Sequence, residues 1–287
     1  KAFPTDPRFA RCLAAAAFRE RDAGLNAAHL EAAYGLSPET QSELRRAIEG
    51  ATLWLSQELG ADDLSGGRRA YTLAANLVGQ WRQKYAGQVA PVAEADLEEA
   101  AAQLELSGGD LRRARVYLVW ATRAEPASRD AFYTLAEIAW RPGDHAAAMR
   151  HLEEGLRLPL RPSESDSVFR PLFQVRQAMV TASSGDRAEA ERRFREAEQS
   201  LDALSRVVTG PDLSNVMFQL AVVRDALGDA NRVRSTLDAA LDATPDSRDA
   251  AARAVTFCLV RGRWADARDL ARRARAQLTL DRPWTVY

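Results

Sequence analysis

Residues 129–162, which read RDAFYTLAEIAWRPGDHAAAMRHLEEGLRLPLRP, contain two helix-forming segments separated by Gly143-Asp144. A glycine adopts the left-handed conformation that closes a first helix, and an aspartate after it caps the start of a second. Ala148 and Gly155 are small, as is typical where two antiparallel helices cross closely. This segment therefore predicts a helical hairpin.

The same turn recurs along the chain. Equivalent glycines lie 34, 42, 43 and 34 residues apart, at Gly109, Gly143, Gly185, Gly228 and Gly262. Five residues after each glycine comes a small residue: Ala114, Ala148, Ala190, Val233 and Ala267. One hairpin leaves a face unburied that the next hairpin covers, so the pattern predicts a stacked array of hairpins, an α-solenoid.

The repeat resembles the tetratricopeptide repeat (TPR) family, on Phe132, Leu135 and Ala136 before the turn and on Leu152 and Leu156 after it. The resemblance implies an all-α fold, a right-handed α-solenoid of TPR hairpins. Its register predicts five repeats in residues 95–287, at about 95–128, 129–162, 171–204, 214–247 and 248–281.

Residues 1–94 are predicted to be a helical N-terminal region, either a cap or degenerate repeats, and we favour degenerate repeats. A hairpin is expected around Gly24, followed by a helix from Ser37 to Leu59. Residues 61–67 are expected to be a linker, followed by a helix to about Tyr85.

The composition excludes several classes of protein. The chain has 287 residues, 46% of them hydrophobic, and carries 39 basic and 40 acidic side chains. This apolar content excludes wholesale disorder, no segment is long and apolar enough to span a membrane, and the balanced charge argues against a dedicated nucleic-acid binder. Cys12 and Cys258 are expected to be reduced, buried thiols. Richness in alanine and arginine favours a bacterial source, and the cytoplasm is slightly favoured over the periplasm.

The sequence lacks the patterns of catalysis, of cofactor binding and of metal binding. His145 and His151 are six residues apart on one predicted helix and so point to opposing sides; we expect both to lie on the surface. Leu64-Ser65-Gly66-Gly67 looks like the signature loop of ABC-type ATPases, but neither lysine of the chain lies in a phosphate-binding loop. We therefore predict a protein that is not an enzyme, with no cofactor and no metal.

Arginines gather on the predicted second helices, for example at Arg192, Arg193 and Arg195. Glutamates and aspartates are interleaved with them, so we expect pairing within each helix. The first repeat opens instead with an acidic series: Glu94, Asp96, Glu98, Glu99, Glu105 and Asp110. An acidic first repeat and a basic last repeat suggest weak head-to-tail self-association.

The resemblance also implies a binding groove lined by positions 2, 5, 9, 12 and 13 of the first helices. We predict that the following residues line it: Asp130, Tyr133, Glu137, Trp140, Arg141, Met179, Asn215, Phe218, Val222 and Asp225. Glu99 and Gln103 replace the lysine and asparagine with which some TPR domains clamp a carboxylate, so that subtype is disfavoured. An extended peptide or a helix with apolar and some basic character fits the predicted groove better.

The sequence thus predicts a protein-interaction scaffold or adaptor that binds a peptide or helix of another protein. Two alternatives remain. The chain could be the sensing domain of a regulator that binds a peptide or small ligand, or a nucleic-acid-binding helical repeat that uses its arginine-rich faces.

Overall fold

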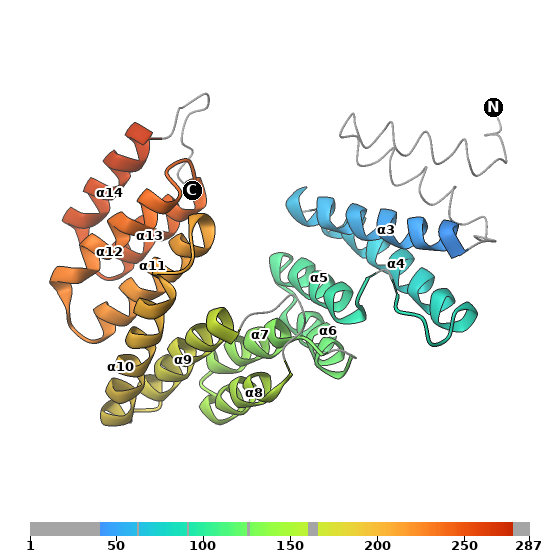
Figure 1. Ribbon diagram of the computed structural model, residues 1–287, viewed down its shortest axis with the longest axis horizontal. Coiled ribbons are helices and arrows are strands. Elements are labelled where there is room, and N and C mark those ends of the chain that lie inside the picture. Colours follow the sequence, from blue (N-terminus) through green and yellow to red (C-terminus); the bar gives the residue numbers. More distant parts are fainter. Residues whose placement is uncertain (1–40, 62, 91, 125–126, 160–165, 278–287) are drawn as a thin grey trace. The chain divides into compact units, whose positions relative to one another are not determined.

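The structure, a computed structural model, describes residues 41–61, 63–90, 92–124, 127–159 and 166–277 (Figure 1). These residues form twelve helices and no strand, which confirms the predicted all-α fold. The hairpin expected around Gly24 and the thiol of Cys12 lie outside the described residues. The chain divides into two compact units, 1–158 and 159–287. The predicted boundary at residue 94 stays a prediction.

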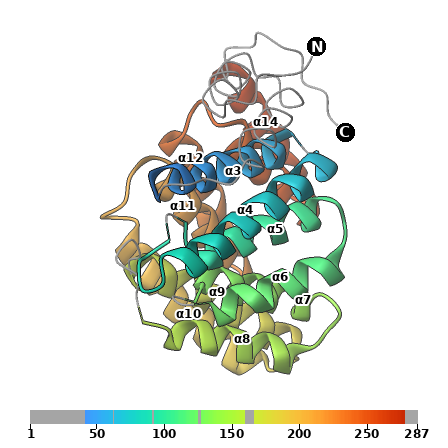
Figure 2. The ribbon, with the colours of Figure 1, turned by 90° about the vertical axis from the view of Figure 1, so that its right-hand side faces the viewer.

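The described residues of the N-terminal unit form three helical hairpins (Figure 2). Their helices are α3 (Gln41–Ala61), α4 (Leu64–Lys84), α5 (Glu94–Ser107), α6 (Leu111–Arg123), α7 (Arg129–Trp140) and α8 (His145–Arg157). In the C-terminal unit, the part that the structure describes also forms three hairpins. Their helices are α9 (Asp166–Ser183), α10 (Arg187–Leu204), α11 (Gly210–Ala226), α12 (Ala230–Ala243), α13 (Arg248–Val260) and α14 (Trp264–Gln277).

The turn chemistry predicted from the sequence is present in the structure. Gly143 has φ 91°, a left-handed conformation that favours glycine, and Asp144 accepts a hydrogen bond from the Ala147 N–H at 3.0 Å. The equivalent aspartates cap α6, α10 and α12 in the same way. The four hairpins from α5–α6 to α11–α12 therefore each combine a left-handed glycine with an aspartate cap, whereas at the α13–α14 turn Arg263 follows Gly262.

The repeated small and large residues form the core. The small residues Ala114, Ala148, Ala190, Val233 and Ala267 are all buried. Between them lie buried larger side chains such as Leu118, Leu152 and Leu237. In the fifth repeat this larger position is Ala271, which is exposed. Small residues let antiparallel helices approach, and the larger side chain fills the remaining space.

The linker predicted at residues 61–67 is wrong, because α4 already begins at Leu64. Asp63 caps this helix by accepting hydrogen bonds from the N–H groups of Ser65 and Gly66. Gly67 is buried so closely against Leu104 of α5 that an added Cβ would lie 2.6 Å from that side chain. The paired glycines therefore permit close helix packing, which links α3 and α4 to α5 in one core.

Candidate partner-binding surface

The predicted groove residues fall in both units. On α7 or at its end, Tyr133, Glu137 and Trp140 are half-buried, whereas Asp130 and Arg141 are exposed. In the C-terminal unit, Met179 lies on α9 and packs against the core that α9, α10 and α11 share. The remaining four predicted residues lie on α11: Asn215, Phe218, Val222 and Asp225.

Three of the four α11 residues contact α13 or its C-terminal turn. The Phe218 ring meets the Phe257 ring of α13 edge to face, with centroids 5.9 Å apart and planes at 75°. The guanidinium of Arg253 lies 5.5 Å from the centroid of the Phe218 ring, and that of Arg261 lies 5.9 Å from the centroid of Phe257. Such cation–π contacts and edge-to-face rings are favourable geometries. The result is an Arg–Phe–Phe–Arg ladder.

Polar contacts fix both ends of this ladder. At one end, Nη1 of Arg253 donates to Oδ1 of Asn215 at 2.8 Å. At the other end, the carboxylate of Asp225 forms one ion pair with Nε of Arg261 at 3.2 Å and another with Nη1 of Arg263 at 3.7 Å. We call Asn215, Phe218, Asp225, Arg253, Phe257 and Arg261 the α11–α13 surface. It presents two half-buried rings between two exposed arginines.

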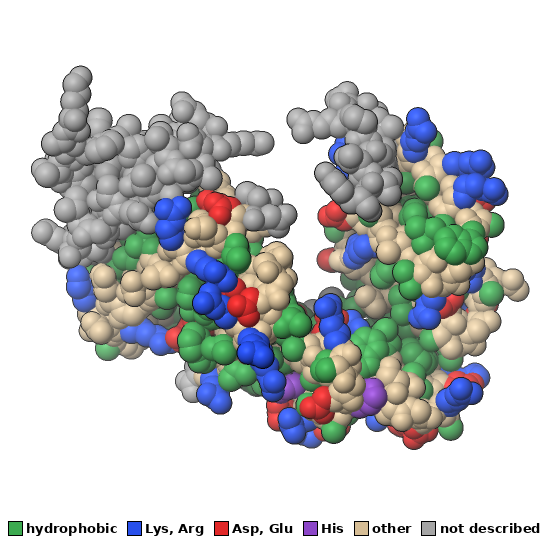
Figure 3. Space-filling view, turned by 180° about the vertical axis from the view of Figure 1, so that it is seen from behind, with side chains coloured by type: hydrophobic (Ala, Val, Ile, Leu, Met, Phe, Trp, Pro, Cys, Tyr) green, Lys and Arg blue, Asp and Glu red, His purple; other side chains and the backbone are tan. Residues whose placement is uncertain are grey.

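Sequence reasoning missed the α13 half of this surface. Beside it, Leu259 and Val260 are 41% and 78% exposed, unusually high for aliphatic residues. They are positions 12 and 13 of the fifth repeat, so extending the predicted register by one repeat would have found them. Arg253 and Phe257 occupy positions 6 and 10, for which the register gave no signal. In Figure 3 the C-terminal unit is drawn at the right, and hydrophobic and cationic side chains are interleaved on its surface.

Comparisons with solved structures identify the fold. A tetratricopeptide repeat protein from Parabacteroides merdae matches with a TM-score of 0.58 and 13% identity, covering 96% of this chain and 94% of its own. The apo form of RapI matches with a TM-score of 0.58 and 12% identity, covering 94% and 98%. The chain has the TPR fold. NprR, solved in complex with its cognate peptide NprX, matches with a TM-score of 0.50 and 14% identity, covering 97% of this chain and 80% of its own. No family model matches the sequence, and no curated protein matches it.

The arginines of this TPR chain are extensively paired, as predicted for α10. There Arg192 donates to Glu189 at 2.7 and 2.8 Å and to Glu196 at 2.5 Å, and Arg195 donates to Glu191 at 2.6 Å. The pKa of Glu189 is lowered to about 2, chiefly because Arg192 donates hydrogen bonds to its carboxylate. The exposed face of α10 therefore carries a network of ion pairs within one helix.

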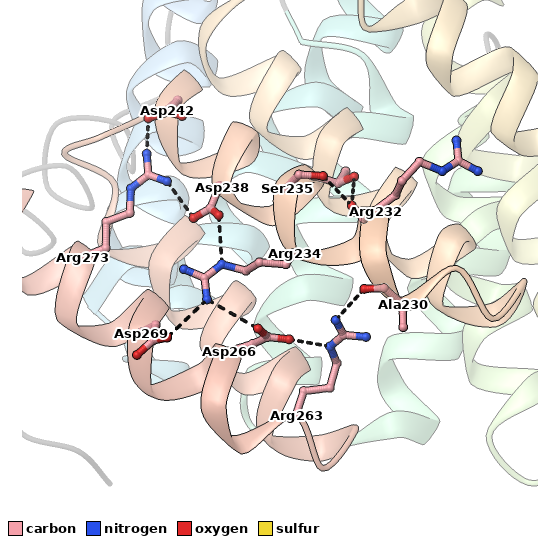
Figure 4. Close-up of polar contacts among 11 residues, drawn as sticks. Ala230, Arg232, Arg234, Ser235, Asp238, Asp242, Arg263, Asp266, Asp269 and Arg273 are labelled. Carbon is pink, nitrogen blue, oxygen red and sulfur yellow. Dashed lines mark hydrogen bonds and ion pairs between the residues drawn. The ribbon is translucent and has the colours of Figure 1, made fainter.

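On α14 the predicted pairing within the helix is present at Arg268 and Arg272, which each lie 3.7 Å from Asp269, but Arg273 pairs with the preceding hairpin instead (Figure 4). Nη1 of Arg273 donates to Asp238 of α12 at 2.7 Å, and Asp238 also accepts from Nε of Arg234 at 2.9 Å. Arg234 reaches Asp266 of α14 at 3.5 Å, and Asp266 pairs with Arg263 at 2.9 Å. These arginines join the last two hairpins and are largely committed to that contact.

Two members of the acidic series that opens the first repeat are buried rather than on a free surface. Glu105 is 1% exposed and accepts a bidentate pair from Arg68 of α4, at 2.8 and 2.6 Å. Glu98 is 6% exposed and accepts from the Tyr71 hydroxyl at 3.0 Å. These carboxylates join α4 to α5, so they do not support the head-to-tail self-association suggested from sequence.

Burial of Glu98 makes the stability of the N-terminal unit depend on pH. Desolvation raises the pKa of Glu98 to about 7, while the hydrogen bond from Tyr71 opposes the rise and Glu94 adds to it. The folded state thus holds a proton that the unfolded chain releases near pH 4.5. Stability from this group is present below about pH 4.5 and is lost as the pH rises through about 7.

We therefore expect the Tm to fall by several degrees more between about pH 5 and about pH 7.5 in the parent than in Glu98→Gln. Glutamine keeps the shape and a hydrogen bond to Tyr71 but does not titrate. Thermal melts followed by circular dichroism at half-unit pH intervals measure the difference. Parallel curves for the two proteins would contradict a buried, protonated Glu98.

His151 corrects another expectation. It is half-buried rather than outward, and its ring lies 6.5 Å from that of Phe132. Burial lowers its pKa, so it is neutral at physiological pH. Cys258 is buried as predicted, and burial raises the pKa of its thiol to about 11.

The described part of the chain contains neither an arrangement typical of a metal site nor a helix typical of a membrane span. No group of three or more His, Cys, Asp or Glu side chains there is arranged to hold a metal ion. Among the same residues, no helix has the length and hydropathy of a membrane span.

Proposed function

We propose that this chain is a non-enzymatic protein-interaction module, a scaffold or adaptor that holds a peptide or helix of a partner protein on the first helices of its hairpins. The α11–α13 surface carries the proposal. Sequence reasoning chose Asn215, Phe218 and Asp225 from repeat positions alone, and these residues contact aromatic and arginine side chains on the adjacent first helix or its C-terminal turn.

The chemistry of this surface suits protein recognition. Aromatic and arginine side chains dominate binding hot spots, because they offer large apolar area and directional hydrogen bonds together. Here the rings are half-buried and held by neighbours, so little conformational freedom would be lost on binding. NprR, which has a similar fold, is known with a peptide bound.

The alternative of a nucleic-acid-binding repeat has less support. Binding to phosphates requires cationic side chains that are available to replace counterions. The arginines of α10 are matched by Glu189, Glu191 and Glu196 on the same helix, and Arg234 and Arg273 are engaged between α12 and α14. These pairs would have to break before the arginines could bind phosphates.

Site-specific photo-crosslinking tests the proposal. A benzophenone amino acid at Val260, at the exposed end of α13, should capture a partner from lysate of the source organism. The same group at Arg195, whose side chain is 68% exposed on the second helix α10, is the matched control. We expect a specific adduct at Val260 and little at Arg195. Equal adducts at both positions, or an adduct at Arg195 alone, would contradict binding on the first helices.

A further inference from the structure

We infer that the α11–α13 surface binds an extended peptide in which one apolar side chain lies between two acidic residues. The inference rests on the proposed function and specifies the chemistry of the partner. It revises the expectation from sequence that the partner has some basic character, because that expectation was drawn without Arg253 and Arg261.

The two arginines are held so that they can receive carboxylates. The guanidinium carbon of Arg253 lies over the Phe218 ring, 5.5 Å from its centroid, and that of Arg261 lies over the Phe257 ring, 5.9 Å from its centroid. A guanidinium has five N–H donors. Contacts among the described residues use one donor of Arg253, to Asn215, and one of Arg261, to Asp225. The remaining donors suit the two parallel hydrogen bonds that a carboxylate accepts.

The charges on this surface favour an acidic partner. Within the described residues, Arg253 forms no ion pair with a carboxylate, even though Asp249 lies one turn earlier on α13. Its contact is with the neutral amide of Asn215. Asp225 pairs with Arg261 and with Arg263, and Arg263 also pairs with Asp266, so each of these two arginines already has a carboxylate partner. The Arg253 end thus retains positive charge without a carboxylate partner, and at the other end Arg261 keeps N–H donors beyond its pair with Asp225, so an acidic partner would complement both ends.

The spacing determines the peptide pattern. Arg253 lies on α13 and Arg261 caps the C-terminal end of that helix eight residues later, a rise of about 12 Å along the helix axis at 1.5 Å per residue. An extended chain rises about 3.3 Å per residue, so residues i and i+4 are about 13 Å apart and face the same side. Residue i+2 also faces that side and would lie over Phe218 and Phe257. The expected pattern is acidic–x–apolar–x–acidic.

Asn215 favours an extended partner over a helical one. Its Oδ1 accepts from Arg253, which leaves the two N–H donors of its exposed side-chain amide toward solvent. An extended main chain offers carbonyl groups to such donors, whereas the carbonyls within a helix are already bonded.

Labelled nine-residue peptides test the inference by fluorescence anisotropy with the full chain. The three probes share the form Gly-Ser-X-Ser-Leu-Ser-X-Ser-Gly, with X as glutamate, glutamine or lysine. We expect the glutamate peptide to bind about tenfold more tightly than the glutamine peptide, and the lysine peptide more weakly still. The preference should shrink between about 50 mM and about 500 mM salt.

Arg253→Gln/Arg261→Gln should abolish the preference for glutamate, whereas Arg192→Gln/Arg195→Gln on α10 should keep it. Circular dichroism melts establish that both variants are folded. Equal affinity of the parent for all three peptides, tighter binding of lysine, or an unchanged preference in Arg253→Gln/Arg261→Gln would overturn the inference. So would a failure of every peptide to bind. The cross-linking result at Val260 does not depend on these peptides and would still judge the proposed function.

Discussion

Arg224→Met is expected to lower the free energy of unfolding of the α10–α12 region by about 3 kcal/mol. The guanidinium of Arg224 is 13% exposed and joins three helices of the C-terminal unit. It bonds to Glu198 and Asp202 of α10 at 3.2 and 3.0 Å, and to the Thr236 hydroxyl of α12 at 2.6 Å. Methionine fills a similar volume but leaves these groups without their shared donor, and that desolvation dominates the loss.

Hydrogen exchange read peptide by peptide measures this effect, because each hairpin of a repeat protein can open on its own. The largest gain in exchange should fall on α10, α11 and α12. Arg224→Lys should recover part of the stability, since one ammonium cannot reach all three partners in the geometry of a guanidinium. Arg195→Met, at an exposed ion pair, should change stability by less than about 0.5 kcal/mol. A similarly small loss of stability in Arg224→Met would contradict the role of Arg224 in holding α10, α11 and α12 together.

Trp54→Ala is expected to destabilise the N-terminal unit by about 4 kcal/mol. Trp54 of α3 is fully buried, and its indole N–H donates to Oε1 of Glu58 at 2.7 Å. Glu58 is itself only 2% exposed. The substitution thus creates a cavity and also removes a donor from a buried carboxylate.

Three further variants, Trp54→Phe, Glu58→Leu and the two combined, separate these contributions. Trp54→Phe keeps most of the apolar volume and should cost about 2 kcal/mol, much of it from the carboxylate left without a donor. In a Glu58→Leu background the same change should cost clearly less, because no buried acid remains. Urea unfolding at pH 7 provides the four free energies. Equal costs in both backgrounds would show that the hydrogen bond contributes nothing.

Much of this fold could be read from the sequence, because its signals are local. Gly143-Asp144 specifies a left-handed turn and a helix cap without reference to any distant residue, and the structure contains both. The linker predicted around Gly66 and Gly67 was wrong because it, too, was drawn from local sequence alone. Paired glycines usually indicate a flexible segment. Here they lie at the start of a helix, where Glu58 of the preceding helix approaches Gly66 and Leu104, far away in sequence, approaches Gly67.

The candidate surface was less predictable than the fold. Family positions identified Phe218 on α11, but the role of Arg253 depends on its distance from that ring, which only the packed helices define. The positions of the acidic residues in the first repeat were hard to predict for the same reason. Glu98 and Glu105 look like surface charges in sequence, yet their partners Tyr71 and Arg68 come from the preceding helix. Pairing between helices leaves no periodic signature.

The most direct test of the central claim compares how a captured partner binds to two matched double variants. Phe218→Ala/Phe257→Ala removes the rings of the α11–α13 surface, and Arg192→Ala/Arg195→Ala removes two exposed arginines of a second helix. Circular dichroism melts confirm folding, and isothermal titration calorimetry measures affinity. We predict a loss of about 2 kcal/mol or more in binding for the first variant and parental affinity for the second. Parental affinity for the first variant, with a loss for the second, would place the partner on the second helices and contradict the account.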